Sequence, residues 1–300
     1  MDSSEWLAGQ FEEHRPRLRA VAYRMLGSLS EADDAVQDTW LRLSRSGAGE
    51  VENLGGWLTT ITARVCLNML RARSHRREEP LDMHVPDLVV SAAGQPQPEE
   101  QAMLADSVGL ALLVVLDTLT PDERLAFVLH DLFGLPFGEI GPLLGRSPAA
   151  AKQMASRARG RVRDAEIPAA SDVGRQREVV DAFFAAARGG NFDALVAVLH
   201  PGIVLRIDAG AQNAGASMLI RGPGAVARQA VTGIRQLLGG PAELRPVLVN
   251  GSAGVVVIRD GLPFAVMSFT TADGLITEID AITDAGRVRT LTAAVLSTGQ

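Results

Sequence analysis

Through the first 165 residues, apolar positions recur every three or four residues, which is the pattern of amphipathic helices. After residue 175 the pattern changes to a few helical stretches and then to short apolar runs separated by turn signals. The chain therefore divides into a helical N-terminal half and a mixed C-terminal third. The helices expected in the first half cover residues 11–26, 30–46, 57–73, 103–118, 120–132, 137–144 and 148–163.

A tight turn joins the last two of these helices, and together they form a helix-turn-helix pattern. Gly145 ends the first helix, because glycine adopts a left-handed backbone without a Cβ clash. Ser147 is a candidate N-cap of the second helix, with Pro148 at its first position. Taken alone, an ordinary helical hairpin with a solvated basic face explains the motif equally well. The side chains of the second helix that can reach DNA bases and phosphates are Lys152, Gln153, Ser156, Arg157 and Arg159.

Two earlier helices carry polar side chains opposite their apolar faces. The helix from Ser30 has acids in its first turn and leaves Asp34, Gln37, Asp38 and Leu41 on an outer face. Simple stabilisation of the helix dipole is the plainer explanation of these acids.

The helix that begins at Trp57 ends among cations. Arg64, Asn68, Arg71 and Arg73 emerge on its polar face. An exposed tryptophan beside arginines suits nucleic acid, where rings stack on bases and arginines hold phosphates. A buried tryptophan, with cations that interact favourably with the C-terminal end of the helix dipole, explains the segment at least as well.

The C-terminal third predicts an α+β cone, in which a curved sheet wraps on helices. Asn250-Gly251 and Asp273-Gly274 are hairpin turn signals. Helices are expected at 175–188, 193–200 and 222–238, and strands at 203–207, 244–249, 255–259, 264–271 and 276–282.

Two segments show neither the helical nor the strand pattern of apolar residues, and we predict that they are linkers. Residues 79–100 contain four prolines and no lysine or arginine, and residues 166–174 are mostly small. The expected domains are therefore residues 8–78, 101–165 and 175–293.

Composition narrows the possible functions. The net charge of −6 argues against a protein that coats DNA, although cations cluster locally at the end of the Trp57 helix and at 157–163. The single cysteine, Cys66, excludes an internal disulfide and a cysteine-built metal site. The chain has no apolar run of about 18 residues and no signal peptide at its start, so we expect a cytoplasmic protein without a membrane segment.

Three blocks occur in the order and spacing of one family. They are EADDAVQDTWLRL at 31–43, GGWLTTITARVCLNMLRARSHRR at 55–77, and LTPDERLAFVLHDLFGLPFGEIGPLLGRSPAAAKQMASRARGRV at 119–162. Together they resemble the extracytoplasmic-function (ECF) sigma factors, the small promoter-reading subunits of bacterial RNA polymerase. The resemblance covers roughly residues 10–165. It departs in the Trp57 helix, because the family often has asparagine where Arg64 stands and aspartate where Asn68 stands. It also departs in the second helix of the helix-turn-helix, where Gly160 and several alanines lower the usual density of cations.

This resemblance implies partners and contact residues. The acidic helix would dock on core RNA polymerase, the Trp57 helix would open and read the −10 promoter element, and the helix-turn-helix would read the −35 element. The polymerase-binding residues implied are Asp33, Asp34, Gln37, Asp38, Trp40 and Leu41. The residues implied for the −10 element are Asn53, Trp57, Arg64, Asn68, Arg71 and Arg73, and those for the −35 element are Ser147, Lys152, Gln153, Ser156, Arg157 and Arg159.

The tract RGGNFDALVAVLHPGIVLRID at 188–208 and the LVNG turn resemble SnoaL-like, ketosteroid-isomerase-like domains. Two tracts typical of related sigma factors are altered here, at 208–212 and at 283–287. Enzymes on this fold need a carboxylate base that faces a hydroxyl or acid donor. Asp208 and Asp280 are candidate carboxylates without an evident donor, and we take His200 to be structural. We expect no catalytic residue, no cofactor and no metal.

The resulting hypothesis is a sigma factor with two all-α domains and a regulatory α+β cone. The cone would regulate sigma activity through an intramolecular contact with the sigma domains. One alternative is a DNA-binding transcriptional regulator with a ligand-sensing C-terminal domain. Another is a small-molecule enzyme attached to a DNA-binding tether.

Overall fold

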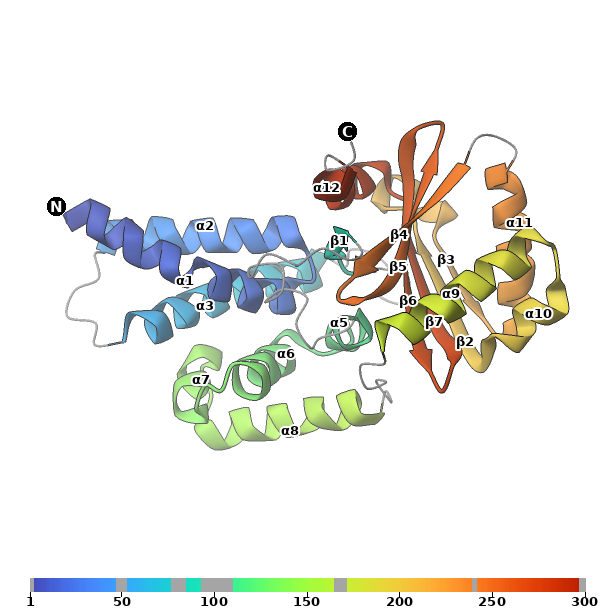
Figure 1. Cartoon of the computed structure of the whole chain (residues 1–300). Coiled ribbons are helices and arrows are strands. Elements are labelled where there is room, and N and C mark those ends of the chain that lie inside the picture. The colour runs from blue at the N-terminus through green and yellow to red at the C-terminus, as the bar shows by residue number, and fades with distance from the viewer. Residues whose placement is uncertain are drawn as a thin grey trace. The chain divides into compact units, whose positions relative to one another are not determined.

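A computed structural model describes residues 3–46, 53–76, 85–92, 110–164, 172–238 and 242–296. The chain forms two compact units (Figure 1). The first comprises Met1–Glu78 and Leu112–Ile167, and the second comprises Glu79–Ala111 and Pro168–Gln300. Residues 85–92 therefore belong to the C-terminal unit, and the rest of the linker predicted at 79–100 lies outside the described residues.

Three helices form the N-terminal helical domain: α1 (Ser3–Leu26), α2 (Leu29–Ser46) and α3 (Leu54–Arg76). Helix α1 is longer than predicted and includes Pro16 within it. Apolar side chains of all three helices are buried. The hydroxyls of Thr39 and Thr62 lie 3.0 Å apart, so a buried hydrogen bond joins α2 to α3. The rings of Phe11 and Trp40 have centroids 5.1 Å apart and join α1 to α2.

The helix-turn-helix domain follows the predicted order. Thr120 and Glu123 form the capping box expected at the start of α6, and each side chain bonds the other's backbone N–H. The single helix predicted at 120–132 instead changes to a π-helical turn from Val128. The elements are α5 (Leu110–Asp117), α6 (Pro121–Phe127), the π-helix η1 (Val128–Leu132), α7 (Phe137–Leu144) and α8 (Pro148–Asp164).

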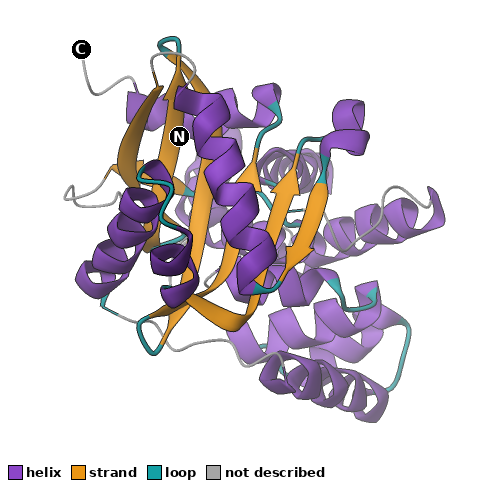
Figure 2. Ribbon diagram, turned by 90° about the vertical axis from the view of Figure 1, so that its right-hand side faces the viewer, coloured by secondary structure: helices purple, strands orange, loops and turns teal. Residues whose placement is uncertain are grey.

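The C-terminal unit is the predicted α+β cone, built on a seven-stranded sheet in the order β1-β4-β5-β6-β7-β2-β3. Helices lie on both faces of this sheet (Figure 2). The pair β2–β7 is parallel and every other pair is antiparallel. The strands are β1 (Val90–Ala92), β2 (Leu199–Asp208), β3 (Met218–Arg221), β4 (Ala242–Val249), β5 (Ser252–Arg259), β6 (Leu262–Ala272) and β7 (Leu275–Ile282). The helices are α9 (Val173–Arg188), α10 (Phe192–Ala197), the 3-10 helix η2 (Ala211–Ala216), α11 (Pro223–Leu238) and α12 (Ala285–Leu296).

The inner face of the sheet packs against α9, α10 and α11. Phe183, Phe184 and Phe269 meet there edge to face, with ring centroids 5.4–5.9 Å apart. Leu205 and Ile279 belong to the same buried cluster. A buried apolar cluster with a central aromatic group therefore lies between the sheet and these helices.

Two-residue turns connect the strands of the meander. Asn250-Gly251 and Asp273-Gly274 have the positive φ angles of hairpin turns, as predicted. Asp260-Gly261 forms a third turn of the same kind, which the sequence analysis missed. Strands β1 and β3 and helix α12 were also not predicted. His200 lies in β2 rather than at a helix end, and its Nδ1 accepts a hydrogen bond from the backbone N–H of Gly202.

Candidate nucleic-acid and protein interfaces

One outward face of α2 carries four exposed side chains. Asp33, Asp34, Gln37 and Leu41 are all exposed, and Leu41 keeps 42% of its surface accessible. The Asp33 carboxylate accepts a 2.6 Å hydrogen bond from Arg19 Nε, which ties this acid to α1. An exposed leucine among acids suits a partner that offers an apolar pocket with a basic rim.

The other two residues predicted to bind polymerase lie differently. Asp38 is half-buried and pairs with Arg42 at 2.9 Å, one turn further along α2. Trp40 is also half-buried, and its ring packs on Phe11. Its contact within the domain positions α1 against α2.

The predicted −10 residues fall into two groups along α3. The Asn53 Oδ1 accepts a 2.9 Å hydrogen bond from the Gly56 N–H and so caps the helix. Trp57 is half-buried, while Arg64 and Asn68 are exposed. The spacing of 57, 64 and 68 places these three side chains on one face of the helix.

Arg71 and Arg73 instead have partners within the chain. Arg71 Nη2 lies 2.8 Å from the Asp122 carboxylate on α6, which belongs to the helix-turn-helix domain. Arg73 forms an ion pair with Glu31 at the start of α2. These two arginines are therefore already neutralised in this structure.

The contact between α3 and α6 is part of a wider polar interface between the two helical domains. Arg124 of α6 is buried, pairs with Asp117, and donates a 3.0 Å hydrogen bond from Nε to the Arg24 carbonyl of α1. The Arg24 guanidinium lies 5.5 Å from the centroid of the Phe133 ring. Arginines of both helical domains thus contribute contacts that join the two domains.

The helix-turn-helix geometry follows the sequence. Gly145 has φ +64° and ends α7, and the Ser147 Oγ accepts from the Ala150 N–H at the start of α8. At Gly141, any Cβ would lie 2.9 Å from the Arg146 carbonyl, so only glycine allows this close turn. The predicted −35 residues all lie exposed along α8 or at its start: Ser147, Lys152, Gln153, Ser156, Arg157 and Arg159.

Carboxylates of the same domain hold the arginines of α8. Arg159 pairs with Asp131 at 2.7 Å, and Arg161 and Arg157 reach Glu123 at 2.9 and 3.4 Å. Burial opposes ionisation of Glu123, but hydrogen bonds from Thr120 and the charge of Arg161 lower the pKa of its carboxyl. Arg159 is thus tied to Asp131, whereas Lys152 and Gln153 lie on the exposed side of α8.

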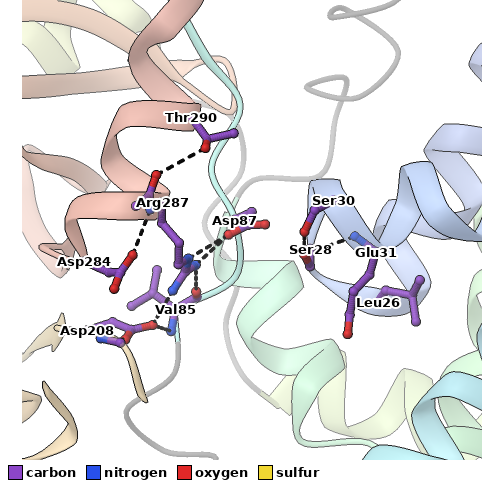
Figure 3. A network of polar contacts seen from close by, with 12 residues as sticks. Leu26, Ser28, Ser30, Glu31, Val85, Asp87, Asp208, Asp284, Arg287 and Thr290 are labelled. Atoms are coloured by element: carbon purple, nitrogen blue, oxygen red, sulfur yellow. Dashed lines mark hydrogen bonds and ion pairs between the residues drawn. The ribbon is translucent and has the colours of Figure 1, made fainter. Parts of the chain in front are cut away.

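A polar network fixes the segment 85–92 onto the C-terminal sheet (Figure 3). Arg287 Nη2 donates a 2.6 Å hydrogen bond to the Val85 carbonyl, and its guanidinium pairs with Asp87 and Asp208. The Asp208 carboxylate in turn accepts from the Val85 N–H at 3.0 Å. Strand β1 follows and pairs with β4, with Val90 opposite Val249.

Asn250 completes the attachment at the hairpin turn between β4 and β5. Its Oδ1 accepts a 2.7 Å hydrogen bond from the Val89 N–H, and its own N–H donates to the Val89 carbonyl at 2.9 Å. Sequence reasoning missed these roles for Asp208, Asn250 and Arg287. A signal existed in the sequence. Asp208 is the first residue of the altered tract at 208–212, and Arg287 is the last residue of the altered tract at 283–287.

Asp280, the other candidate carboxylate, lies on the opposite face of β7 from the core residue Ile279. It is buried and forms an ion pair with Arg206 at 3.0 Å. Both candidate carboxylates are therefore engaged by arginines, which supports a structural role for each.

Within the described residues, none of the helices is long and apolar enough to cross a membrane, and no cluster of metal-binding side chains occurs.

Comparisons with known proteins agree on one family. The models Sigma-70 region 2 and Sigma-70, region 4 match residues 10–76 and 109–162. The ECF RNA polymerase sigma factor SigJ of Mycobacterium tuberculosis is 37% identical over 259 residues, which cover 85% of this chain and 81% of SigJ. The probable ECF RNA polymerase sigma factor SigI of the same organism is 37% identical over 212 residues, covering 70% and 72%. The crystal structure of SigJ superposes with a TM-score of 0.71 at 32% identity and covers 93% of this chain and 97% of that chain.

The Arg287 network generates a prediction about local stability. Arg287→Gln removes hydrogen bonds to a charged group, each of which contributes about 1.5–3 kcal/mol. We expect amide hydrogen exchange of residues 85–92 to accelerate by about tenfold or more. Arg245→Gln, which breaks the exposed pair with Glu243 on β4, is the matched control and should leave the exchange unchanged. Equal exchange in the wild type and Arg287→Gln would contradict this role.

The environment of Asp280 generates a prediction about pH. Burial raises the pKa of its carboxyl to about 6, against the opposing charge of Arg206. The folded state thus binds this proton more tightly than the unfolded chain, so the Asp280 contribution to stability falls as pH rises from about 4 to about 6 and is constant above. An NMR titration of the labelled Asp280 carboxyl should give a midpoint near pH 6. A midpoint below pH 4 would show that burial does not raise this pKa. Relative to Asp280→Asn, the wild type should lose stability across that same window.

Proposed function

This chain belongs to the ECF RNA polymerase sigma factors, and from that premise we propose how its surfaces divide the work of promoter-specific initiation. The outer face of α2, formed by Asp33, Asp34, Gln37 and Leu41, docks on core RNA polymerase in the cytoplasm. The exposed face of α3 reads the −10 element and the exposed face of α8 reads the −35 element. The observation that carries this division is that all three faces remain exposed while the apolar residues between them are buried.

The contact between the two helical domains represents a closed form of the sigma unit. The −10 and −35 elements lie about 25 base pairs apart, which is ~85 Å of duplex at ~3.4 Å per base pair. Arg71 and Asp122, on the two DNA-reading parts, touch directly. The contact must therefore open before both elements are read, and DNA phosphates compete with Asp122 for Arg71.

The C-terminal domain regulates this opening through the segment between the two helical domains. Strand β1 and the Arg287 network hold residues 85–92 in the sheet. Because this segment joins the N-terminal helical domain to the helix-turn-helix domain, its attachment restrains the path between them. The cone would thus act in cis, without a separate inhibitor protein.

The chain works without catalysis in this proposal. Asp208 and Asp280 are held by Arg287 and Arg206. The buried cluster between the sheet and its covering helices is apolar. A DNA-binding regulator that does not replace sigma would need neither the α2 face nor the Trp57 helix.

The polymerase surface is tested by Leu41→Arg. A cation in place of the exposed leucine should weaken binding to core polymerase by about tenfold or more, because a central apolar contact of an interface contributes ~2 kcal/mol. Titration of labelled core enzyme measures the affinity. Glu178→Arg, an exposed charge reversal on α9, is the control. Loss of binding by both variants, or by neither, would count against the α2 face.

The closed form is tested by Asp122→Asn. A partly exposed ion pair contributes up to about 1 kcal/mol, so the ratio of open to closed molecules should rise by up to about fivefold. Energy transfer between dyes on Ser44→Cys and Ala149→Cys reports the separation of α2 and α8. Cys66 is buried, and burial raises the pKa of its thiol, so it stays unlabelled.

Asp131→Asn is the matched control, because Asp131 pairs with Arg159 inside the helix-turn-helix domain. It should leave the energy transfer unchanged. Two results would contradict a role of Asp122 in holding the two helical domains together. One is energy transfer that stays unchanged in Asp122→Asn, and the other is an equal decrease in Asp131→Asn.

A further inference from the structure

The Glu123 side chain joins two elements of the helix-turn-helix domain. Its Oε2 accepts a 2.8 Å hydrogen bond from the Thr120 hydroxyl and a 3.3 Å hydrogen bond from the Thr120 backbone N–H, which belong to the capping box of α6. The same oxygen accepts a 2.9 Å hydrogen bond from Arg161 Nη1 in α8. One buried carboxylate therefore connects the first turn of α6 to the helix that carries the predicted −35 residues.

The two arginines beside Glu123 differ in how firmly they are held. Arg161 donates a hydrogen bond between two charged groups, which is about twice as strong as a neutral hydrogen bond. Arg157, one turn earlier on the same side of α8, lies 3.4 Å from Glu123 Oε1 and keeps 62% of its side chain exposed. Arg157 is predicted to contact DNA, whereas Arg161 is not. Arg157 can therefore turn to a phosphate while Arg161 keeps α8 attached to α6.

The apolar packing of α8 defines its rotation about its own axis only weakly. The buried face of α8 is made of the alanines Ala151, Ala155 and Ala158. Alanine allows close packing, but a row of single methyl groups interlocks with a neighbouring helix less than larger side chains do. Because successive residues are about 100° apart around a helix, Arg161 lies to one side of this alanine face. Its bond to Glu123 therefore opposes rotation of α8 directly.

A small rotation of α8 is enough to change which bases it can read. An atom about 6 Å from a helix axis moves by ~2 Å when the helix rotates by about 20°. Hydrogen bonds to base edges require side chains placed to within ~0.5 Å. Phosphate contacts depend mainly on charge and tolerate such a movement. A rotated α8 would therefore lose discrimination between bases and keep most of its affinity for DNA.

We propose that Glu123 is a positioning residue for −35 specificity, an inference that rests on the proposed sigma function. Glu123 itself contacts no DNA in this role. Through Arg161 it fixes the rotation of α8, so that the exposed Gln153 and Ser156 meet base edges. Thr120 orients the carboxylate from the other side and makes it a rigid anchor.

The test uses the full chain bound to core RNA polymerase and a promoter from which the wild type initiates. The −35 element is randomised, and sequencing of the bound DNA gives the ratio of affinities for the best and the average −35 sequence. Glu123→Gln keeps the capping box, which accepts either residue, but removes the charge that holds Arg161. We expect the ratio to fall by about fivefold or more, since one good base contact supplies that discrimination. The average affinity and the melting temperature should stay close to those of the wild type.

Three further variants separate the ion pair from other effects. Arg161→Gln breaks the same pair from the other side and should lower the ratio by a similar factor. Arg161→Lys keeps the charge and should preserve the ratio. Glu139→Gln, which removes an exposed carboxylate of α7, is the matched control and should change nothing.

Four results would overturn the inference. They are an unchanged ratio in Glu123→Gln, an equal loss of affinity for every −35 sequence, a ratio that falls only together with the melting temperature, and a ratio that falls as far in Arg161→Lys as in Arg161→Gln. The second indicates a lost phosphate contact and the third indicates damaged packing. Failure of the proposed sigma function is seen separately, because the wild type would then form no complex with core polymerase or select no −35 sequence.

Discussion

The attachment of residues 85–92 to the C-terminal sheet is the interaction on which the organisation of this sigma factor depends. Arg287 binds the backbone carbonyl of Val85 and the carboxylates of Asp87 and Asp208. Asn250 bonds both backbone groups of Val89. Side chains thus satisfy backbone groups that an open linker would leave to water. As a result, the C-terminal unit contains a piece of chain that lies in sequence between the two helical domains.

A second feature of the molecule is the pairing of carboxylates with the arginines that are predicted to contact DNA. Asp122 holds Arg71, and Asp131 holds Arg159. Partly exposed pairs of this kind are weak, so phosphates can replace the carboxylates at little cost. We infer that the arginines are oriented in advance and that free DNA binds less readily than promoter DNA presented by polymerase.

Local sequence signals predicted the parts of the fold that local interactions build. Gly145, the Thr120–Glu123 capping box and the hairpin turn at Asn250-Gly251 are examples, because each depends on neighbours within a few residues. Strand β1 could not be predicted in this way. It is three residues long, lies in a proline-rich segment, and pairs with a strand more than 150 positions away. The ion pairs of Arg71 and Arg73 escaped prediction for the same reason, since both partners are distant in sequence.

Regulation through the attachment of residues 85–92 to the C-terminal sheet is tested most directly by run-off transcription. Wild-type protein and an Arg287→Gln/Asn250→Ala variant are each combined with core RNA polymerase on one promoter at equal, saturating concentrations. Because the attachment restrains the path between the two helical domains, we expect the variant to give several-fold more transcript from the same start site. Equal or lower output from a variant whose residues 85–92 exchange freely would contradict control by the C-terminal domain through this segment.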